Sequence, residues 1–175
     1  LGHCGLVLDG CLVPEARRLG TEGRAFDLIA KPLRTLEDTL LGGAMVGAMQ
    51  AELEVLARWQ RGTRPTPDTL RRLGALRLEL KAIDTLVSQA SRQLARSGPG
   101  EELADLNAGL RILLQRWQAG CEAFAAQFDD HETRLLDITS DLRTVLGIAR
   151  GVGDARHLKA GTGLFSTKEN HEIPA

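Results

Sequence analysis

A seam of apolar residues at heptad spacing constrains the fold of this chain more than any other feature of its sequence. Between residues 73 and 94, an apolar residue recurs at alternating intervals of three and four positions. This spacing places the side chains on one face of an α-helix, whereas a half-buried β-strand would need them at every second position. The seam predicts a long helix that packs along one face against other helices. Its members are Leu73, Leu76, Leu80, Ile83, Val87, Ala90 and Leu94.

The residues on either side of this seam predict where its helix begins and ends. Thr66 is suited to the N-cap, Pro67 to the first helical position, and Asp68 to the positive end of the helix dipole. The run Ser97-Gly98-Pro99-Gly100 then ends the pattern.

A second helix is expected before the seam, from Pro32 to near Gly62. Its middle is apolar around most of its circumference, which is typical of a helix at the centre of a bundle. Gly43 and Gly47 are one turn apart, so we expect another backbone to approach closely there.

Residues 101–150 contain no proline and allow two interpretations. The heptad spacing that starts at Leu103 slips after Trp117 and then resumes, as in a single helix with a stutter. The other interpretation is two helices, the first ending near Gly120 and the second starting by Asp130. A short internal similarity favours two helices, because residues 56–62 and 114–120 match at five of seven positions.

The predicted fold is therefore all-α: an antiparallel bundle of four helices, arranged as two αα-hairpins, over residues 32–150. Residues 1–31 are expected to form a short non-helical segment, in which Asp9-Gly10 between two apolar triplets is the signal for a β-hairpin turn; a helical or irregular conformation of these residues is the alternative. Residues 151–175 contain several glycines and few apolar positions, and predict an extended, flexible tail.

Composition excludes several classes of partner. The chain has 175 residues and a formal net charge of −1, which does not favour nucleic acid. Its longest uncharged run, residues 39–51, is shorter than the ~20 residues of a transmembrane helix. Three cysteines do not make a disulfide framework, so free thiols in a reducing compartment such as the cytoplasm are expected.

Three residues are the candidates for chemistry: His131, His157 and Cys121. His131-Glu132-Thr133-Arg134 resembles the start of the phospho-accepting box of sensor histidine kinases, without the proline that usually follows. The run from His157 to Gly161 resembles that of histidine-phosphotransfer domains, with its lysine one residue too close. No second histidine lies three or four residues from His131, so no metal or other cofactor is predicted.

The sequence is best explained as a non-enzymatic helical interaction or assembly module, which forms a homo-oligomer or joins a larger complex. The residues expected to carry the interaction are Leu73, Leu76, Leu80, Ile83, Val87 and Leu94 of the seam. The alternative is a signalling or ligand-sensing four-helix bundle, related to phosphotransfer domains through His131 or His157.

Overall fold

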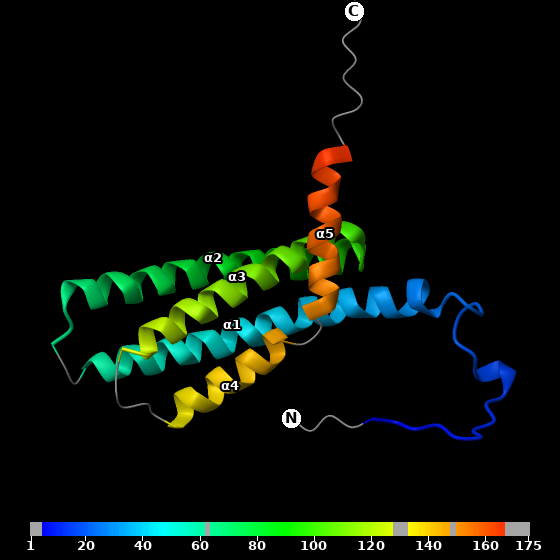
Figure 1. Ribbon diagram of the computed structural model, residues 1–175, viewed down its shortest axis with the longest axis horizontal. Coiled ribbons are helices and arrows are strands. Elements are labelled where there is room, and N and C mark those ends of the chain that lie inside the picture. Colours follow the sequence, from blue (N-terminus) through cyan, green and yellow to red (C-terminus); the bar gives the residue numbers. More distant parts are fainter. Residues whose placement is uncertain (1–4, 62–63, 128–132, 148–149, 167–175) are drawn as a thin grey trace, which may run out of the picture.

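The computed structural model describes residues 5–61, 64–127, 133–147 and 150–166 (Figure 1). Within these ranges every regular element is helical, which confirms the all-α class. Two short elements come first, a 3-10 turn η1 (Glu15–Arg17) and a π-helical turn η2 (Phe26–Ala30). The α-helices are α1 (Lys31–Arg61), α2 (Pro67–Ser97), α3 (Glu101–Ala125), α4 (Thr133–Gly147) and α5 (Arg150–Ser166).

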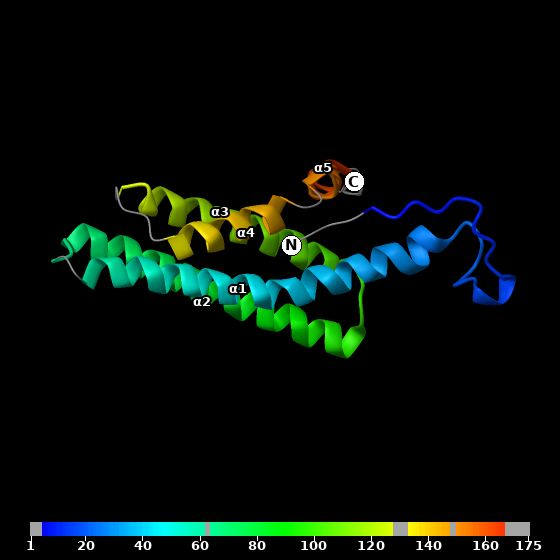
Figure 2. The ribbon, with the colours of Figure 1, turned by 90° about the horizontal axis from the view of Figure 1, so that it is seen from below.

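The three long helices form the body of the molecule. Helix α1 packs along α2 and α3, α2 packs along α3, and the shorter α4 lies against α1 and α3. Helix α5 contacts α3 and points away from the body (Figure 1). The first turns of α1 extend past the connection between α2 and α3, as Figures 1 and 2 both show. The three long helices thus lie together over most of the body, whereas at one end the first turns of α1 extend beyond the other two.

The ends of α2 agree with the prediction from its flanking residues. Thr66 is the N-cap, and its Oγ1 accepts a hydrogen bond from the backbone N–H of Thr69 at 3.2 Å. At the other end Gly98 takes a left-handed conformation with φ of 71°, and its N–H donates to the carbonyl of Leu94. Helix α1 also confirms its predicted range to within a residue at each end.

The core lies between α1, α2 and α3, and the heptad seam of α2 is part of it. Leu76, Leu80, Ile83, Val87 and Ala90 are buried there, with Leu73 and Leu94 half-buried at its edges. Across from the seam, Trp117 of α3 is fully buried, and its indole N–H donates to the Leu76 carbonyl at 2.8 Å. The seam is therefore occupied by packing within the chain.

The division of residues 101–150 differs in position from the prediction. Two helices are present, but α3 continues through Gly120 to Ala125, and α4 starts at Thr133. Gly120 does not end the helix because Cys121, Phe124 and Ala125 are buried beyond it, and this packing exceeds the ~1 kcal/mol that a glycine costs a helix.

Both ends of the chain also depart from the prediction. No strand is present among residues 5–14, because both apolar triplets are exposed and an isolated hairpin of this size is marginal in water. The expected flexible tail is wrong for residues 150–166, which form α5 as a fifth helix. Side-chain contacts hold α5 in place, with Arg156 donating to Asp105 at 2.7 Å and Lys159 to Glu101 at 2.6 Å.

Candidate functional site

The outer face of η2 and α1 carries an apolar stripe that the rest of the described chain leaves partly exposed. We call the outer stripe the six positions at alternating intervals of four and three residues: Ile29, Leu33, Leu36, Leu40, Gly43 and Gly47. Its four large side chains have exposed fractions of 36, 49, 36 and 66% in that order, and both glycines are exposed. A buried seam on α2 keeps the same spacing with exposed fractions of at most 7% between Leu76 and Ala90.

A polar layer fixes the rotation of α1 that turns this stripe outward. The side-chain amide of Asn107, buried on α3, donates to the carbonyl of Thr35 at 3.1 Å and to Oγ1 of Thr39 at 2.8 Å. Beside it, Asp38 lies 3.6 Å from a guanidinium nitrogen of Arg111. These contacts turn positions 35, 38 and 39 toward α3. Leu36 and Leu40 must then point to the opposite side of the helix.

The glycines of the outer stripe face open space, which corrects the expectation of a close backbone approach within the chain. A Cβ placed on Gly43 or Gly47 would meet no other atom within 4 Å. The glycine of α1 that does pack against a neighbour is Gly42, where a Cβ would lie 3.3 Å from a side-chain atom of Val87 of α2. Gly43 and Gly47 therefore leave a shallow, uncovered surface beside the leucines of the stripe.

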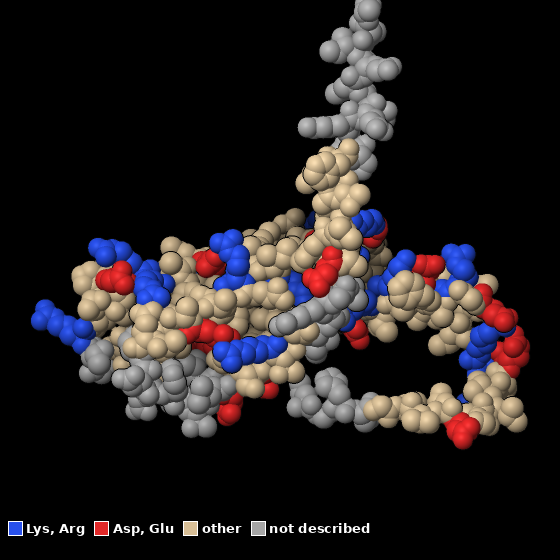
Figure 3. Space-filling view, viewed as in Figure 1, with Lys and Arg blue, Asp and Glu red and all other residues tan. Residues whose placement is uncertain are grey.

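The N-terminal segment adds more exposed apolar side chains to this end of the molecule. Figure 3 shows the segment and the start of α1 standing clear of the packed body. Of the 19 large apolar residues that are exposed among the described residues, 13 lie between Leu6 and Leu41. Exposed apolar side chains are normal when scattered singly, but their concentration in one region makes this end of the molecule the candidate site.

A second polar layer, at the other end of α1, centres on the buried carboxylate of Glu52. Its Oε1 accepts hydrogen bonds from Gln118 at 3.1 Å and from Thr139 at 2.5 Å, joining α1 to α3 and α4. Its Oε2 has no N–H or O–H partner among the described residues. Burial is the main cause that raises the pKa of Glu52, and its hydrogen bonds oppose that rise.

The predicted candidate Cys121 belongs to this layer and is unsuited to nucleophilic chemistry. It is fully buried on α3, next to Glu52. Burial raises the pKa of the Cys121 thiol far above its ordinary value, and the nearby Glu52 carboxylate raises it further. Because the thiolate is the nucleophile and the metal ligand, this thiol is inert at neutral pH.

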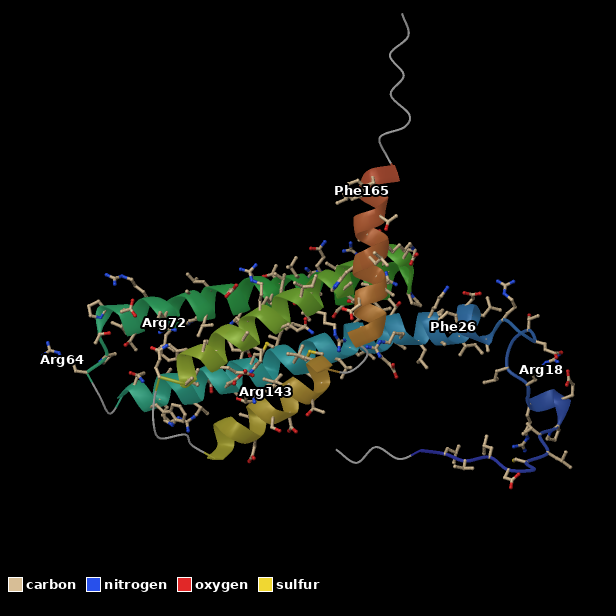
Figure 4. The ribbon with its side chains drawn as sticks, in the orientation of Figure 1. Arg18, Phe26, Arg64, Arg72, Arg143 and Phe165 are labelled. Carbon is tan, nitrogen blue, oxygen red and sulfur yellow. The ribbon has the colours of Figure 1, made fainter. Side chains whose placement is uncertain are left out.

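An open groove of about 500 Å³ lies beside the Glu52 layer, between α3 and α4. Arg143 crosses it from α4 and binds Glu122 of α3 through two hydrogen bonds, of 2.7 and 2.8 Å (Figure 4). This pairing is the main cause that lowers the pKa of Glu122 and raises that of Arg143. Gln118 also lines the groove, and its side-chain oxygen is buried without a hydrogen-bond partner.

Only one of the two predicted histidine candidates lies among the described residues. His157 is exposed on α5. His131 and the predicted kinase-like box that begins with it lie at or beside the undescribed residues 128–132. Among the described ranges, no group of three His, Cys, Asp or Glu side chains is placed to hold a metal ion.

By length and composition alone, the helix Phe26–Gln60 is apolar enough to cross a membrane. Core helices of globular proteins and signal sequences satisfy the same test, and 39% of the 18-residue apolar stretch of this helix is buried against the rest of the chain.

Comparison with known proteins gives no relative: no protein-family model, curated protein or solved structure matches this chain.

The sequence predicts an interaction surface on the α2 seam, which is buried within the chain, and does not predict the exposed outer stripe. The signal was present, because α1 is apolar on more than one face. That pattern predicts burial at the centre of a bundle, whereas in the structure only the inner face of α1 is covered by other helices.

Proposed function

We propose that this protein is a non-enzymatic helical assembly module, which uses the first half of α1 and the segment before it to form an oligomer or join a complex. The observation that carries the proposal is the outer stripe, a row of exposed leucine and isoleucine side chains on a helix whose other face is already packed. Burial of a fully exposed large apolar side chain gains roughly 1.5–3 kcal/mol, and the side chains of this row, which are 36–66% exposed, would gain the corresponding part of it.

The internal chemistry of the bundle supports a structural role. In both polar layers the hydrogen bonds join α1 to α3, so these groups position helices. The buried thiol of Cys121 has a raised pKa, and the Glu122 and Arg143 charges beside the groove are paired with each other. These groups account for the fit between helices, and the outer stripe is left as the surface available to a partner.

Measurement of the mass of the full chain in native buffer, across a range of concentrations, tests this proposal. We expect a defined oligomer that dissociates on dilution. A chain that stays monomeric at every concentration, and that retains no partner when purified under mild conditions from its own cells, would contradict it.

The groove between α3 and α4 favours a second candidate, a ligand-sensing bundle. Gln118, Glu122 and Arg143 line the groove and offer polar groups to a small polar ligand there. A screen of small amines and amino acids for thermal stabilisation would test this candidate. Stabilisation that Arg143→Gln abolishes is the expected result, and no stabilisation by any compound would count against it.

Phosphotransfer is the part of this second candidate that involves histidine. Incubation with phosphorylated response regulators, followed by detection of acid-labile phosphate, tests His157 through the His157→Gln variant. Labelling that survives this substitution would direct attention to His131, and an unlabelled protein would remove phosphotransfer from consideration.

A further inference from the structure

The outer stripe has a spacing that reads the same in both directions along α1. From Ile29 to Gly47 the intervals are four, three, four, three and four residues, and the midpoint lies at position 38. An α-helix rises 1.5 Å per residue, so the part of the stripe within α1, from Leu33 to Gly47, is roughly 21 Å long, and Ile29 precedes it in the turn η2. An identical stripe laid across it in the opposite direction therefore meets it position for position.

Side-chain size makes this antiparallel overlap complementary. Ile29 falls opposite Gly47 of the other stripe, and Leu33 falls opposite Gly43. Each large side chain thus meets a glycine, above which the structure has open space. At the centre Leu36 falls opposite Leu40, and two such pairs form around the midpoint. A parallel arrangement would instead stack leucine on leucine at one end and leave glycine facing glycine at the other.

The chemistry of the stripe also restricts what can cover it. None of its six positions is charged, so a partner gains nothing there from a charged surface. Heptad spacing on an exposed helix fits a second helix with apolar residues at the same spacing. The outer stripe is itself such a surface, and a two-fold axis buries the same patch on both copies and closes the assembly.

We propose that the outer stripe binds the outer stripe of a second copy of this chain, with the two α1 helices antiparallel across a two-fold axis at position 38. This inference rests on the proposed assembly function and names its partner and its geometry. It uses only residues of α1 and the helical turn before it, so the groove and both polar layers remain outside the interface.

A charge placed at the centre of the stripe is the first test. Leu40→Glu would bury a carboxylate without a partner in the dimer, whereas in the monomer position 40 is exposed. We expect the wild-type chain to have the mass of a dimer and Leu40→Glu to have that of a monomer, with self-association at least about 100-fold weaker. The matched control is Leu78→Glu, at an exposed leucine on the outer face of α2, which should remain a dimer.

A size exchange tests the predicted register. Gly47→Leu should weaken the dimer, because the new side chain collides with Ile29 of the other copy. Adding Ile29→Ala should restore association, since it opens the space that the leucine needs. Gly109→Leu serves as the control, because Gly109 is exposed on α3 with nothing near its added Cβ, and it should not change the mass.

Cysteine cross-linking tests the direction of the two helices, in a chain from which Cys4 and Cys11 have been removed by substitution with serine. When Ile29→Cys and Gly47→Cys chains are mixed, the antiparallel dimer should give cross-links between the two variants. Cross-links of each variant with itself would indicate parallel helices and overturn the inference.

The remaining outcomes separate this inference from the proposed function. An oligomer whose mass Leu40→Glu does not change would leave assembly intact and overturn the use of the stripe. A monomer that binds phosphatidylcholine vesicles, and loses that binding on Leu40→Glu, would show that the stripe faces a membrane and would overturn the inference as well. A monomer that binds neither itself nor vesicles would overturn both.

Discussion

Helices α1 and α2 have the same length and the same heptad spacing, yet they use their apolar residues in opposite ways. In α2 the apolar seam points inward and is buried. In α1 the inward face includes Thr35, Thr39 and Glu52, all buried, while the outer stripe is exposed. The contrast shows that burial depends on which contacts fix the rotation of a helix. An apolar stripe alone does not determine which face of a helix is packed.

The largest expected difference between the two helices is in the free energy of unfolding that is lost when one apolar side chain on each is truncated. Ile83→Ala removes a buried side chain from the α2 seam and should lower the free energy of unfolding by about 2–5 kcal/mol. Leu40→Ala removes an exposed one and should change it by less than about 0.5 kcal/mol in the monomer. Denaturant titration at low protein concentration measures both.

The exposed Leu78 of α2 provides the control for this pair, because Leu78→Ala should behave as Leu40→Ala does at low concentration. Raising the concentration should then distinguish the two exposed sites, with only Leu40→Ala losing stability relative to wild type. If Leu40→Ala were as costly as Ile83→Ala at every concentration, the outer face of α1 would be packed within the monomer and the contrast would disappear.

A smaller effect is expected from the carboxylate on the inner face of α1, a type of residue that the buried face of α2 lacks. Since burial raises the pKa of Glu52 above the ordinary value of 4.5, the folded state holds its proton more tightly than the unfolded state does. The free energy of unfolding is therefore undiminished by Glu52 below pH 4.5, where its carboxyl is protonated. It falls as pH rises through the raised pKa, because the buried carboxyl must then ionise. Glu52→Gln should stabilise the fold by about 1 kcal/mol at pH 8, because it removes a buried charge.

The pH dependence distinguishes this effect from a simple change in packing. The gain from Glu52→Gln should shrink toward zero near pH 4, where Glu52 is protonated in both states. The Glu122 pair acts in the other direction, because its lowered pKa stabilises the fold above pH 4.5 and that contribution is lost on acidification. Glu54→Gln, on the exposed side of α1, is the surface control. A gain from Glu52→Gln that is equal at pH 4 and pH 8 would disprove the buried-charge explanation.

Features that depend on local sequence were predictable from the chain. The cap at Thr66, the turn at Gly98 and the seam between them all follow from neighbouring residues, so the range of α2 was correct. The range of α1 followed from Pro32 and from the breaker run after residue 62 in the same way.

Features that depend on contacts between distant residues were not predictable. Burial of Cys121 and Phe124 carries α3 past Gly120, and the ion pairs of Arg156 and Lys159 hold α5 against α3. The outer stripe was missed for the same reason. Its exposure depends on Asn107, which lies 68 or more residues away along the chain from the groups that it binds.

The smallest expected effect is seen by comparing two adjacent glycines of α1, the buried Gly42 and the exposed Gly43. Gly43→Ala should raise the free energy of unfolding by about 0.5–1 kcal/mol, because alanine favours a helix and its Cβ meets no atom there. At Gly42 the new Cβ would lie 3.3 Å from Val87, so part or all of that gain should be lost to crowding against α2. Both variants are best compared by thermal unfolding in the Leu40→Glu chain, which removes self-association from the measurement. Equal gains at the two positions would mean that α2 yields easily at Val87 and that the inner face of α1 is packed no more tightly than the outer one.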